Sequence, residues 1–556
     1  MKSKLSLLIV LLTIVSLMLS ACGSAAPTTA PVAAAATEAP AVAATDAPAA
    51  AASTEAPAAP AAAGIYPKVT VAVSQDPGDL KPVGVNMGSK PYIYHEFYEN
   101  LFDLVDNEYV PVLAKGFTKV DDLHYDVQLY ENIYDSAGNH ITASDVVYST
   151  QVLVDAGMNF KWYMVGDIKA KDDYTVEYTW SKPITDVGEL EFPWCRTVIF
   201  SQKSYEASPD KFATAPIATG AYVVKEFTSG SKIVLEANPK YWQTDKSLVS
   251  TRHQANVQTI EYDVISEPAQ NVIALETGAV DYSELVPAEN LAEFQTGGKY
   301  ADKYNSEVAS GSYVYALNLN QSAGKAGADL NLRLAVFYAI DNASIATALQ
   351  ETIVPAKAFG TPHFGSEYQA AWDTTPNYVN TFDPEKAKEL LAKTAYKGEK
   401  LILATMQDDN SQKIATVIQG FLLNVGINTE IKILDQTEQN IIDTESDGYD
   451  IKIFGMGGGS LIGEWNRVMN NHELGKDYSV GFVKDPQLQT LFETANAIAS
   501  HTPENLTALE NYVLANGYFY AIGSPRINMV YSKNISKVVF RENEFILPGS
   551  STYVAP

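Results

Sequence analysis

The residue patterns that most often carry catalysis are missing from this sequence. It contains neither the G-x-S-x-G elbow of serine hydrolases nor the G-x-x-x-x-G-K-[ST] loop of nucleotide-binding enzymes. The pairs His95-Glu96 and His472-Glu473 lack the second histidine that a zinc-binding H-E-x-x-H motif requires. His363 and His472 are the histidines that could contact a nickel or haem ligand, but no histidine spacing in the sequence indicates a metal site. We therefore expect no enzyme activity, no metal site and no cofactor.

Two stretches instead carry residue types that suit reversible ligand binding. Asp408-Asp409-Asn410 places two carboxylates where they would meet a cation or hydroxyl donors, or else lie solvated at a loop tip. Gly457-Gly458-Gly459 exposes backbone NH and CO groups to close approach by a ligand. Trp465 follows closely, and it could stack on a sugar ring or an apolar side chain, or be a core residue.

A β-hairpin is the clearest local element that the sequence predicts. Ala221–Phe227 and Lys232–Ala237 are rich in Val, Ile, Leu, Tyr and Phe, and Thr228-Ser229-Gly230 between them has the composition of a hairpin turn. Asn238-Pro239 ends the second strand, because proline cannot donate to a ladder.

A βαβ unit positions the acidic stretch. Leu401–Met406 predicts a strand, Lys413–Asn424 a helix closed by Gly426, and Ile427–Leu434 a second strand. Just before this unit, Phe382–Leu391 predicts a helix that has Asp383 as N-cap and Pro384 in its first turn.

Several of these stretches also resemble one known family. Pro216–Trp242, PIATGAYVVKEFTSGSKIVLEANPKYW, resembles the G-T-G-P-Y … L-x-x-N-x-x-Y-W signature of the extracytoplasmic solute-binding proteins of peptide/nickel-type ABC importers. Leu330–Asp341 resembles that family's D-x-R-V-R-x-A-x-x-Y-A-I-D, and Phe382–Leu391 its Y-D-P-E-K-A-K-x-L-L. Tyr98-Glu99-Asn100-Leu101 matches its Y-E-x-L. The resemblance runs in order from about Pro67 to the C-terminus.

The resemblance implies an α/β fold of the periplasmic-binding-protein class. In that fold, two crossing hinge strands join two lobes, and the ligand is trapped between the lobes. The first lobe carries an extra subdomain. The implied bounds are 66–90, 193–305 and 527–556 for the first lobe, 91–192 for the extra subdomain and 306–526 for the second lobe.

The resemblance also implies where charged ligand anchors should lie, and the sequence departs from both. Dipeptide-binding members place an Asp for the peptide amine at a position that falls near Gly459, whereas the next acid here is Glu464. They place an Arg for the peptide carboxylate where this chain has Gln407-Asp408-Asp409. These departures disfavour a simple dipeptide ligand and suit a neutral ligand held by aromatic rings and backbone groups.

Further candidate residues follow from the same resemblance. His363-Phe364 and Trp372 fall where the family crosses the rim of the cleft. Trp194 and Arg196 fall near the return to the first lobe, and Arg196 could meet a ligand carboxylate or form a surface salt bridge. We expect Cys195 to be a buried thiol outside any disulfide.

The N-terminus predicts export and a lipid anchor. Lys2 and Lys4 precede Leu5–Leu19, an apolar run too short to span a membrane comfortably. Leu19-Ser20-Ala21-Cys22 resembles a bacterial lipobox, in which the cysteine is lipidated; the alternative is an ordinary signal peptide that contains a cysteine. Gly23–Gly64 is a tract of Ala, Pro and Thr that predicts a semi-extended tether. The predicted divisions are 1–21 for the signal peptide and 22–65 for the lipid-anchored cysteine and linker.

Composition restricts the partners. The 556 residues suit two or three domains, and the net charge of −27 argues against a nucleic-acid partner, which needs basic patches. Two cysteines are too few for a thiolate metal cluster.

Together these observations predict a monomeric receptor held on the outer face of the cytoplasmic membrane. It would capture an oligopeptide-like solute by hinge closure and deliver it to an ABC permease and its ATPase. The alternatives are an oligosaccharide receptor of the same family, a tethered ligand sensor, and a secreted hydrolase whose nucleophile and base we do not find.

Overall fold

The computed structural model describes residues 65–83, 91–105, 108–156, 165–181, 183–184, 190–311, 313–444, 448–457, 460–471, 477–541 and 545–554. The chain divides into residues 1–59 and residues 60–556, and all described residues belong to the second unit. The predicted signal peptide, Cys22 and the tether lie outside the described residues, as do Gly458, Gly459 and His472-Glu473. In the described ranges, no helix has both the length and the apolar character needed to cross a membrane.

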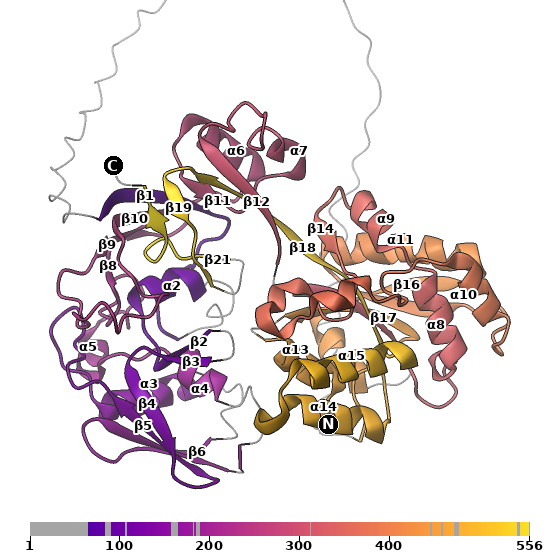
Figure 1. Ribbon diagram of the computed structural model, residues 1–556, viewed down its shortest axis with the longest axis horizontal. Coiled ribbons are helices and arrows are strands. Elements are labelled where there is room, and N and C mark those ends of the chain that lie inside the picture. The colour runs from indigo at the N-terminus through magenta and orange to yellow at the C-terminus, as the bar shows by residue number, and fades with distance from the viewer. Residues whose placement is uncertain are drawn as a thin grey trace, which may run out of the picture. The chain divides into compact units, whose positions relative to one another are not determined.

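One long strand organises the largest sheet. β18 (Phe519–Ser532) lies between β13 and β11 in the order β16-β15-β17-β13-β18-β11-β1-β10-β9-β8. Its first half pairs with β13 (Tyr313–Leu319) and β14 (Ile353–Pro355), and its second half with β12 (Tyr304–Ser310) and β11 (Tyr282–Ser283). The consecutive strands β12 and β13 therefore run antiparallel to β18 and, with it, link the two halves of the sheet (Figure 1).

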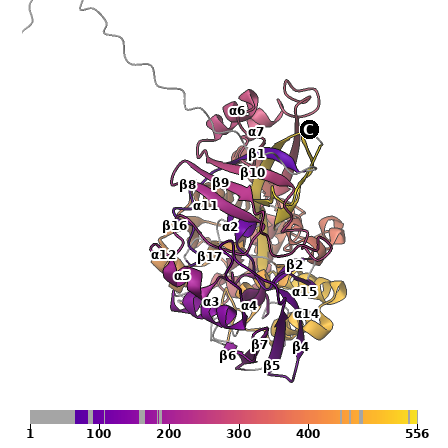
Figure 2. The same cartoon turned by 90° about the vertical axis from the view of Figure 1, so that its left-hand side faces the viewer.

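The first half of the sheet contains the predicted hairpin. β8 (Tyr222–Thr228) and β9 (Lys232–Ala237) pair antiparallel, which confirms the prediction, and β9 continues the sheet to β10 (Val257–Val264) and β1 (Tyr66–Val73), which are parallel (Figure 2). The surrounding elements are α2 (Pro91–Phe97), α5 (Gln202–Ala207), α6 (Pro268–Thr277), α7 (Ala288–Leu291), β19 (Ile535–Lys537), β20 (Phe540–Arg541), β21 (Phe545–Ile546) and β22 (Thr552–Tyr553).

The second half of the sheet contains the predicted βαβ unit. β15 (Leu401–Met406) and β16 (Thr429–Leu434) pair parallel, and β15 also pairs parallel with β17 (Ile451–Gly457). The helices of this half are α8 (Leu330–Tyr338), α9 (Asn342–Ala348), α10 (Pro384–Leu391), α11 (Asp409–Val425), α12 (Gln436–Ile441), α13 (Leu461–Met469), α14 (Pro486–Asn496) and α15 (Pro503–Asn516). Short 3-10 helices are η4 (Ala326–Ala328), η5 (Pro362–Glu367), η6 (Ala370–Thr374), η7 (Ile442–Thr444) and η8 (Ile498–Ser500).

Helix caps confirm one boundary and correct another. Asp383 caps α10 by accepting a hydrogen bond from the Lys386 NH at 2.8 Å, as predicted. The helix expected over Lys413–Asn424 begins earlier, because Asp408 accepts a hydrogen bond from the Ser411 NH at 2.9 Å and serves as its N-cap.

A separate sheet, in the order β4-β5-β7-β6, follows β1 in the chain. α3 is capped by the reciprocal Thr142–Asp145 box and contacts β6 and β7. The elements of this part are β2 (Phe102–Val105), β3 (Glu108–Pro111), β4 (Ala114–Lys119), β5 (His124–Leu129), α3 (Ala143–Asp155), β6 (Val165–Ala170), β7 (Thr175–Trp180) and α4 (Glu191–Cys195).

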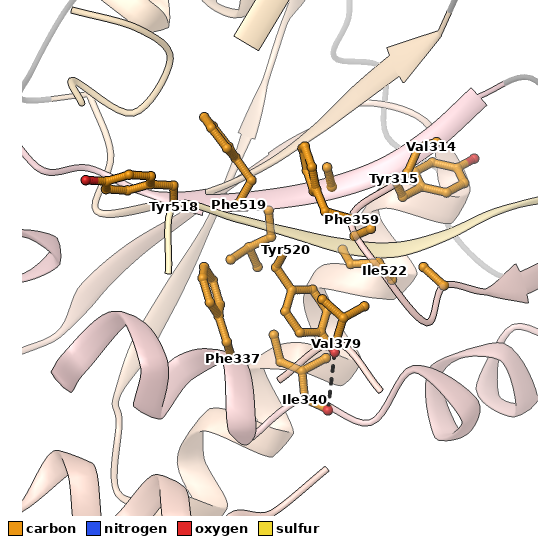
Figure 3. Close-up of a cluster of buried hydrophobic side chains, with 14 of the residues drawn as sticks. Val314, Tyr315, Phe337, Ile340, Phe359, Val379, Tyr518, Phe519, Tyr520 and Ile522 are labelled. Atoms are coloured by element: carbon orange, nitrogen blue, oxygen red, sulfur yellow. Dashed lines mark hydrogen bonds between the residues drawn. The ribbon is translucent and has the colours of Figure 1, made fainter. Parts of the chain in front are cut away.

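Three buried clusters of side chains form the main cores. The first core includes Val71, Leu235 and Met529, the second includes Phe337, Phe359 and Tyr520, and the third includes Val127, Tyr178 and Trp194. Figure 3 shows part of the second core, in which the Tyr520 hydroxyl donates to the Ile340 carbonyl at 3.4 Å.

A few residues near the predicted domain bounds pack in a different core from the one that those bounds would suggest. Ile93 and Phe97 of α2 pack in the first core, although the predicted extra subdomain begins at residue 91. Trp194 and Cys195 pack in the third core, although that subdomain was expected to end at residue 192. The bounds themselves stay a prediction.

Candidate functional site

One edge of the large sheet gathers the polar side chains that suit ligand binding. β15 and β17 are parallel, and β13 is antiparallel to β17, so the carboxyl ends of β15 and β17 lie at the same edge as the start of β13. Ligands of α/β proteins usually bind outside the carboxyl ends of such strands. We call this region the β17 edge, meaning the side of the sheet where β15 and β17 end and β13 starts, together with the adjoining loops and the start of α13.

Two tyrosines of β13 form the aromatic part of the β17 edge. Tyr313 lies opposite Gly457 and Tyr315 opposite Gly455 in the ladder, and their rings meet edge-to-face with centroids 5.2 Å apart. A Cβ atom added to Gly455 would overlap the Tyr313 hydroxyl. The absence of a side chain at Gly455 thus leaves room for the Tyr313 ring.

Polar contacts join these rings to the end of β15 and the start of α11. The Tyr313 hydroxyl donates to the Met406 sulfur at 3.4 Å, and the Asn410 side-chain amide donates to the Tyr315 hydroxyl at 3.3 Å. Burial, with the neighbouring Tyr315 and the negative charge of Asp408, raises the pKa of Tyr313, so its phenol stays protonated. The Tyr313 side chain is partly exposed, whereas Tyr315 is buried.

Glu464, in the first turn of α13, is the buried charge of the β17 edge. Its side chain is 1% exposed, Arg467 approaches its Oε1 to 4.0 Å, and its Oε2 has no hydrogen-bond partner in the described ranges. Burial raises the pKa of Glu464 to about 7, and Arg467, the Gly457 NH and Arg196 oppose this only partly. A buried carboxylate oxygen without a hydrogen-bond donor is costly, so a cationic ligand group that reached Oε2 would be favourable here.

A cavity of about 240 Å³ adjoins the same edge. Met406, Gly455 and Arg467 line it together with the apolar side chains of Phe454 and Met456. At its inner end, Lys452 is buried and forms an ion pair with Asp443. The cavity is large enough for one side chain or one sugar ring.

The predicted acids lie near this edge but on the surface. Asp408 is exposed and its carboxylate caps α11, and Asp409 is exposed in the first turn of the same helix. Gly457 ends β17, and its carbonyl accepts a hydrogen bond from Arg467 at 3.2 Å. Gly458 and Gly459 follow outside the described residues.

The predicted aromatic residues of this half pack inward. Trp465 is fully buried in a stack between Phe359 and Trp372, with ring centroids 5.9 and 6.0 Å away, which favours the alternative that it is a core residue. His363 and Phe364 are also mostly buried in η5, and the Thr361 hydroxyl lies 2.9 Å from His363 Nδ1. The structure therefore does not bring these four rings to the β17 edge.

The predicted residues of α4 and its end divide between core and surface. Trp194 is fully buried in the third core, where Phe117 contacts its ring at 4.7 Å. Arg196 is half-buried, and its charge acts on Glu464. Cys195 is buried and forms no disulfide in the described ranges.

Sequence reasoning missed Tyr313, Tyr315, Glu464 and Arg467 as site residues. A signal for the tyrosines was present, because a Y-x-Y strand and a G-x-G strand can pair ring against glycine when they are neighbours. The pairing of β13 with β17 joins segments more than a hundred residues apart, so the pattern alone does not reveal it.

Comparison with known proteins shows the family to which the chain belongs. The family model for bacterial extracellular solute-binding proteins, family 5 (middle region), matches residues 108–475. The periplasmic murein peptide-binding protein MppA of Escherichia coli K12 is 24% identical over 445 residues, which cover 71% of this chain and 75% of MppA. The nickel-binding periplasmic protein of the same strain is 22% identical over 375 residues, covering 62% of this chain and 66% of that protein.

A solved structure shows the same fold. HbpA2 from Haemophilus parasuis aligns with a TM-score of 0.74 at 17% identity, covering 88% of this chain and 100% of that chain. This likeness confirms the expected two-lobed α/β fold.

The protein is thus a solute-binding protein of the periplasmic-binding-protein class. Because the family model covers more than half of its 556 residues, the chain belongs to the bacterial extracellular solute-binding proteins of family 5. It is accordingly a non-enzymatic, extracytoplasmic receptor of an ABC transporter, which confirms the expected class and partners at that level.

Proposed function

We propose that this receptor captures an oligopeptide-like solute with a free amine and delivers it to its permease. The observation that carries the proposal is Glu464, a buried carboxylate with an unpartnered oxygen at the β17 edge. A ligand ammonium group would supply the missing donors and the opposite charge. Peptide binding by MppA, as its name states, supports the same ligand class.

The neighbouring side chains suit the rest of such a ligand. Tyr313 offers a partly exposed ring and hydroxyl, Asn410 an amide, and the adjoining cavity room for one side chain. Arg196 and Arg467 are cations within electrostatic reach of Glu464, and either could meet a ligand carboxylate. These groups bind without making or breaking bonds.

Capture would proceed by hinge closure of two lobes. β18 and the β12–β13 passage are the covalent links between the two halves of the sheet, and small backbone changes in them would rotate one half against the other. A lipid on Cys22 and the tether after it would keep the receptor at the outer face of the cytoplasmic membrane.

A specific observation also favours the oligosaccharide alternative. The partly exposed ring of Tyr313, at the same end of the strands as the cavity of about 240 Å³, is suited to contact with a sugar ring, which needs no charged anchor.

Isothermal titration with three ligand panels separates the two. Free-amine peptides of three to eight residues should bind, the same peptides N-acetylated should bind at least tenfold more weakly, and neutral oligosaccharides should not bind. Glu464→Gln should abolish the difference between free and acetylated peptides, whereas Glu430→Gln, an exposed acid in β16, should leave it unchanged. Binding by oligosaccharides alone would establish the alternative.

A further inference from the structure

A second group of ionisable side chains is buried away from the β17 edge. His95 of α2, Asp103 of β2 and His253 of the loop between β9 and β10 are 7%, 3% and 2% exposed. One nitrogen or oxygen atom can be chosen from each so that all three atoms lie within 4.8 Å of one another. The three residues come from separate segments of the chain and converge without a local sequence motif.

The contacts within this group leave part of it unsatisfied. His253 Nε2 lies 3.4 Å from the Asp103 carboxylate, and the Ser250 hydroxyl donates to that carboxylate at 2.5 Å. The rings of His95 and His253 have centroids 5.8 Å apart. Nδ1 of His253 is buried without a hydrogen-bond partner in the part of the chain that the structure describes.

Buried carboxylates surround these three residues. Glu96 accepts a hydrogen bond from the Gly549 NH at 3.1 Å, and Glu99 accepts from Tyr241 and Trp242 at 2.6 and 2.8 Å. Within the described ranges, no lysine or arginine forms an ion pair with Glu96, Glu99 or Asp103; Arg252 donates instead to the Leu104 carbonyl at 2.9 Å. Buried carboxylates usually have a cation or a metal as partner.

We propose that His95, Asp103 and His253 form a binding site for a divalent transition-metal ion of the zinc type. Two imidazole nitrogens and one carboxylate oxygen suit Zn²⁺, whereas Mg²⁺ and Ca²⁺ take oxygen ligands. Around Zn²⁺ the ligand atoms lie roughly 3.3 Å apart, from bond lengths of about 2 Å, so side-chain movements that bring these atoms up to about 1.5 Å closer would close the site. The ion would join α2, β2 and the loop before β10.

Metal stoichiometry tests the site directly. The full chain is treated with a chelator, supplied with a twofold excess of Zn²⁺, desalted and measured by elemental analysis and calorimetry. We expect one Zn²⁺ per chain and a melting temperature several degrees higher, with no retention of Mg²⁺. His253→Gln and Asp103→Asn should retain less than a tenth of that zinc while keeping the far-ultraviolet circular dichroism spectrum of the original chain.

His124→Gln is the matched control, because His124 also lies beside a carboxylate, at 2.8 Å from Asp121, but on the surface. It should keep one Zn²⁺ per chain. Uptake of no zinc by the original chain, or equal uptake by His253→Gln, would overturn the proposal. If His253→Gln does not fold, Co²⁺ added to the original chain decides: absorption bands of nitrogen- and oxygen-ligated Co²⁺ support the site, and their absence rejects it.

Discussion

At the scale of single residues, the buried acids determine how this receptor should respond to pH. Glu464 and Glu510 are both almost completely buried, and burial raises the pKa of each to about 7. They differ in their partners, because both Glu510 oxygens accept backbone NH groups, from Phe359 and Gly360, whereas Glu464 keeps one oxygen unpartnered in the described ranges. We therefore assign a binding role to Glu464 and a structural role to Glu510.

Peptide affinity should rise between pH 5 and pH 7 if Glu464 binds a ligand ammonium group. Below its raised pKa the carboxyl is protonated, and binding must first remove that proton. For a carboxyl with a pKa near 7, the peptide affinity should rise roughly tenfold or more between pH 5 and pH 7. Titration calorimetry at several pH values measures the slope, which should vanish in Glu464→Gln and persist in Glu430→Gln. An equal slope in Glu464→Gln would contradict the assignment.

Glu510 should make the protein less stable as the pH rises. The folded protein holds this proton more tightly than the unfolded chain, whose carboxyl has a pKa near 4.5, so the unfolding free energy falls between about pH 4.5 and pH 7 and then levels off. Glu510→Gln does not titrate, so its stability relative to the original chain should rise over that window by up to about 3 kcal/mol. Urea unfolding measures this, with Glu504→Gln in the same helix as the control.

At the scale of elements, the start of α11 separates a structural role of Asp408 from a binding role. Asp408→Ala should lower the unfolding free energy by about 1 kcal/mol, since it removes the N-cap, whereas Asp408→Asn keeps a capping oxygen and should cost little. Asp409→Ala, in the next position, should change stability less. Denaturant unfolding and ligand titration on the same variants are compared. A lower peptide affinity in Asp408→Asn at unchanged stability would show that the carboxylate faces the ligand.

Local sequence patterns predict the hairpin and the helices whose signals lie close together in the sequence. The hairpin β8–β9 and the capped helix α10 were found because their turn, cap and proline signals lie within a few residues of each other. α11 was expected to begin later because Asp408 was interpreted as a loop acid and not as a cap. The register that sets Tyr313 against Gly457 depends on pairing between distant segments, and the burial of Trp465 depends on a stack with Phe359 and Trp372.

The two groups of buried ionisable side chains that we propose as sites are also difficult to predict from local sequence patterns. Glu464 lies five residues after the position that the family pattern indicates, and only burial distinguishes it from a surface acid. His95, Asp103 and His253, which we propose as a metal site, span more than 150 residues, so histidine spacing alone does not indicate them. Both sites arise from tertiary packing that no short motif encodes.

At the scale of the whole molecule, the predicted lipid anchor should affect location and not affinity. Cys22→Ala should move the receptor from the membrane fraction to the soluble fraction, because the mature chain would lose its acyl anchor. Deletion of residues 23–64 should leave ligand affinity unchanged if the tract only acts as a tether. Membrane fractionation and titration of the purified variants measure both. A Cys22→Ala variant that still sediments with membranes would disprove the lipid anchor.

The path of β18 also has a consequence for how the chain folds. The second core draws all its residues from Val314 to Ile522, so that half can fold once this continuous segment is available. The first core joins Val69 near the start of the described chain to Met529 and Leu547 near its end, and in the sheet β11 lies between β1 and β18. Its contacts close loops of more than 450 residues, which slows folding. The half that is made first should therefore be the last to fold, only after the final strands have been synthesised.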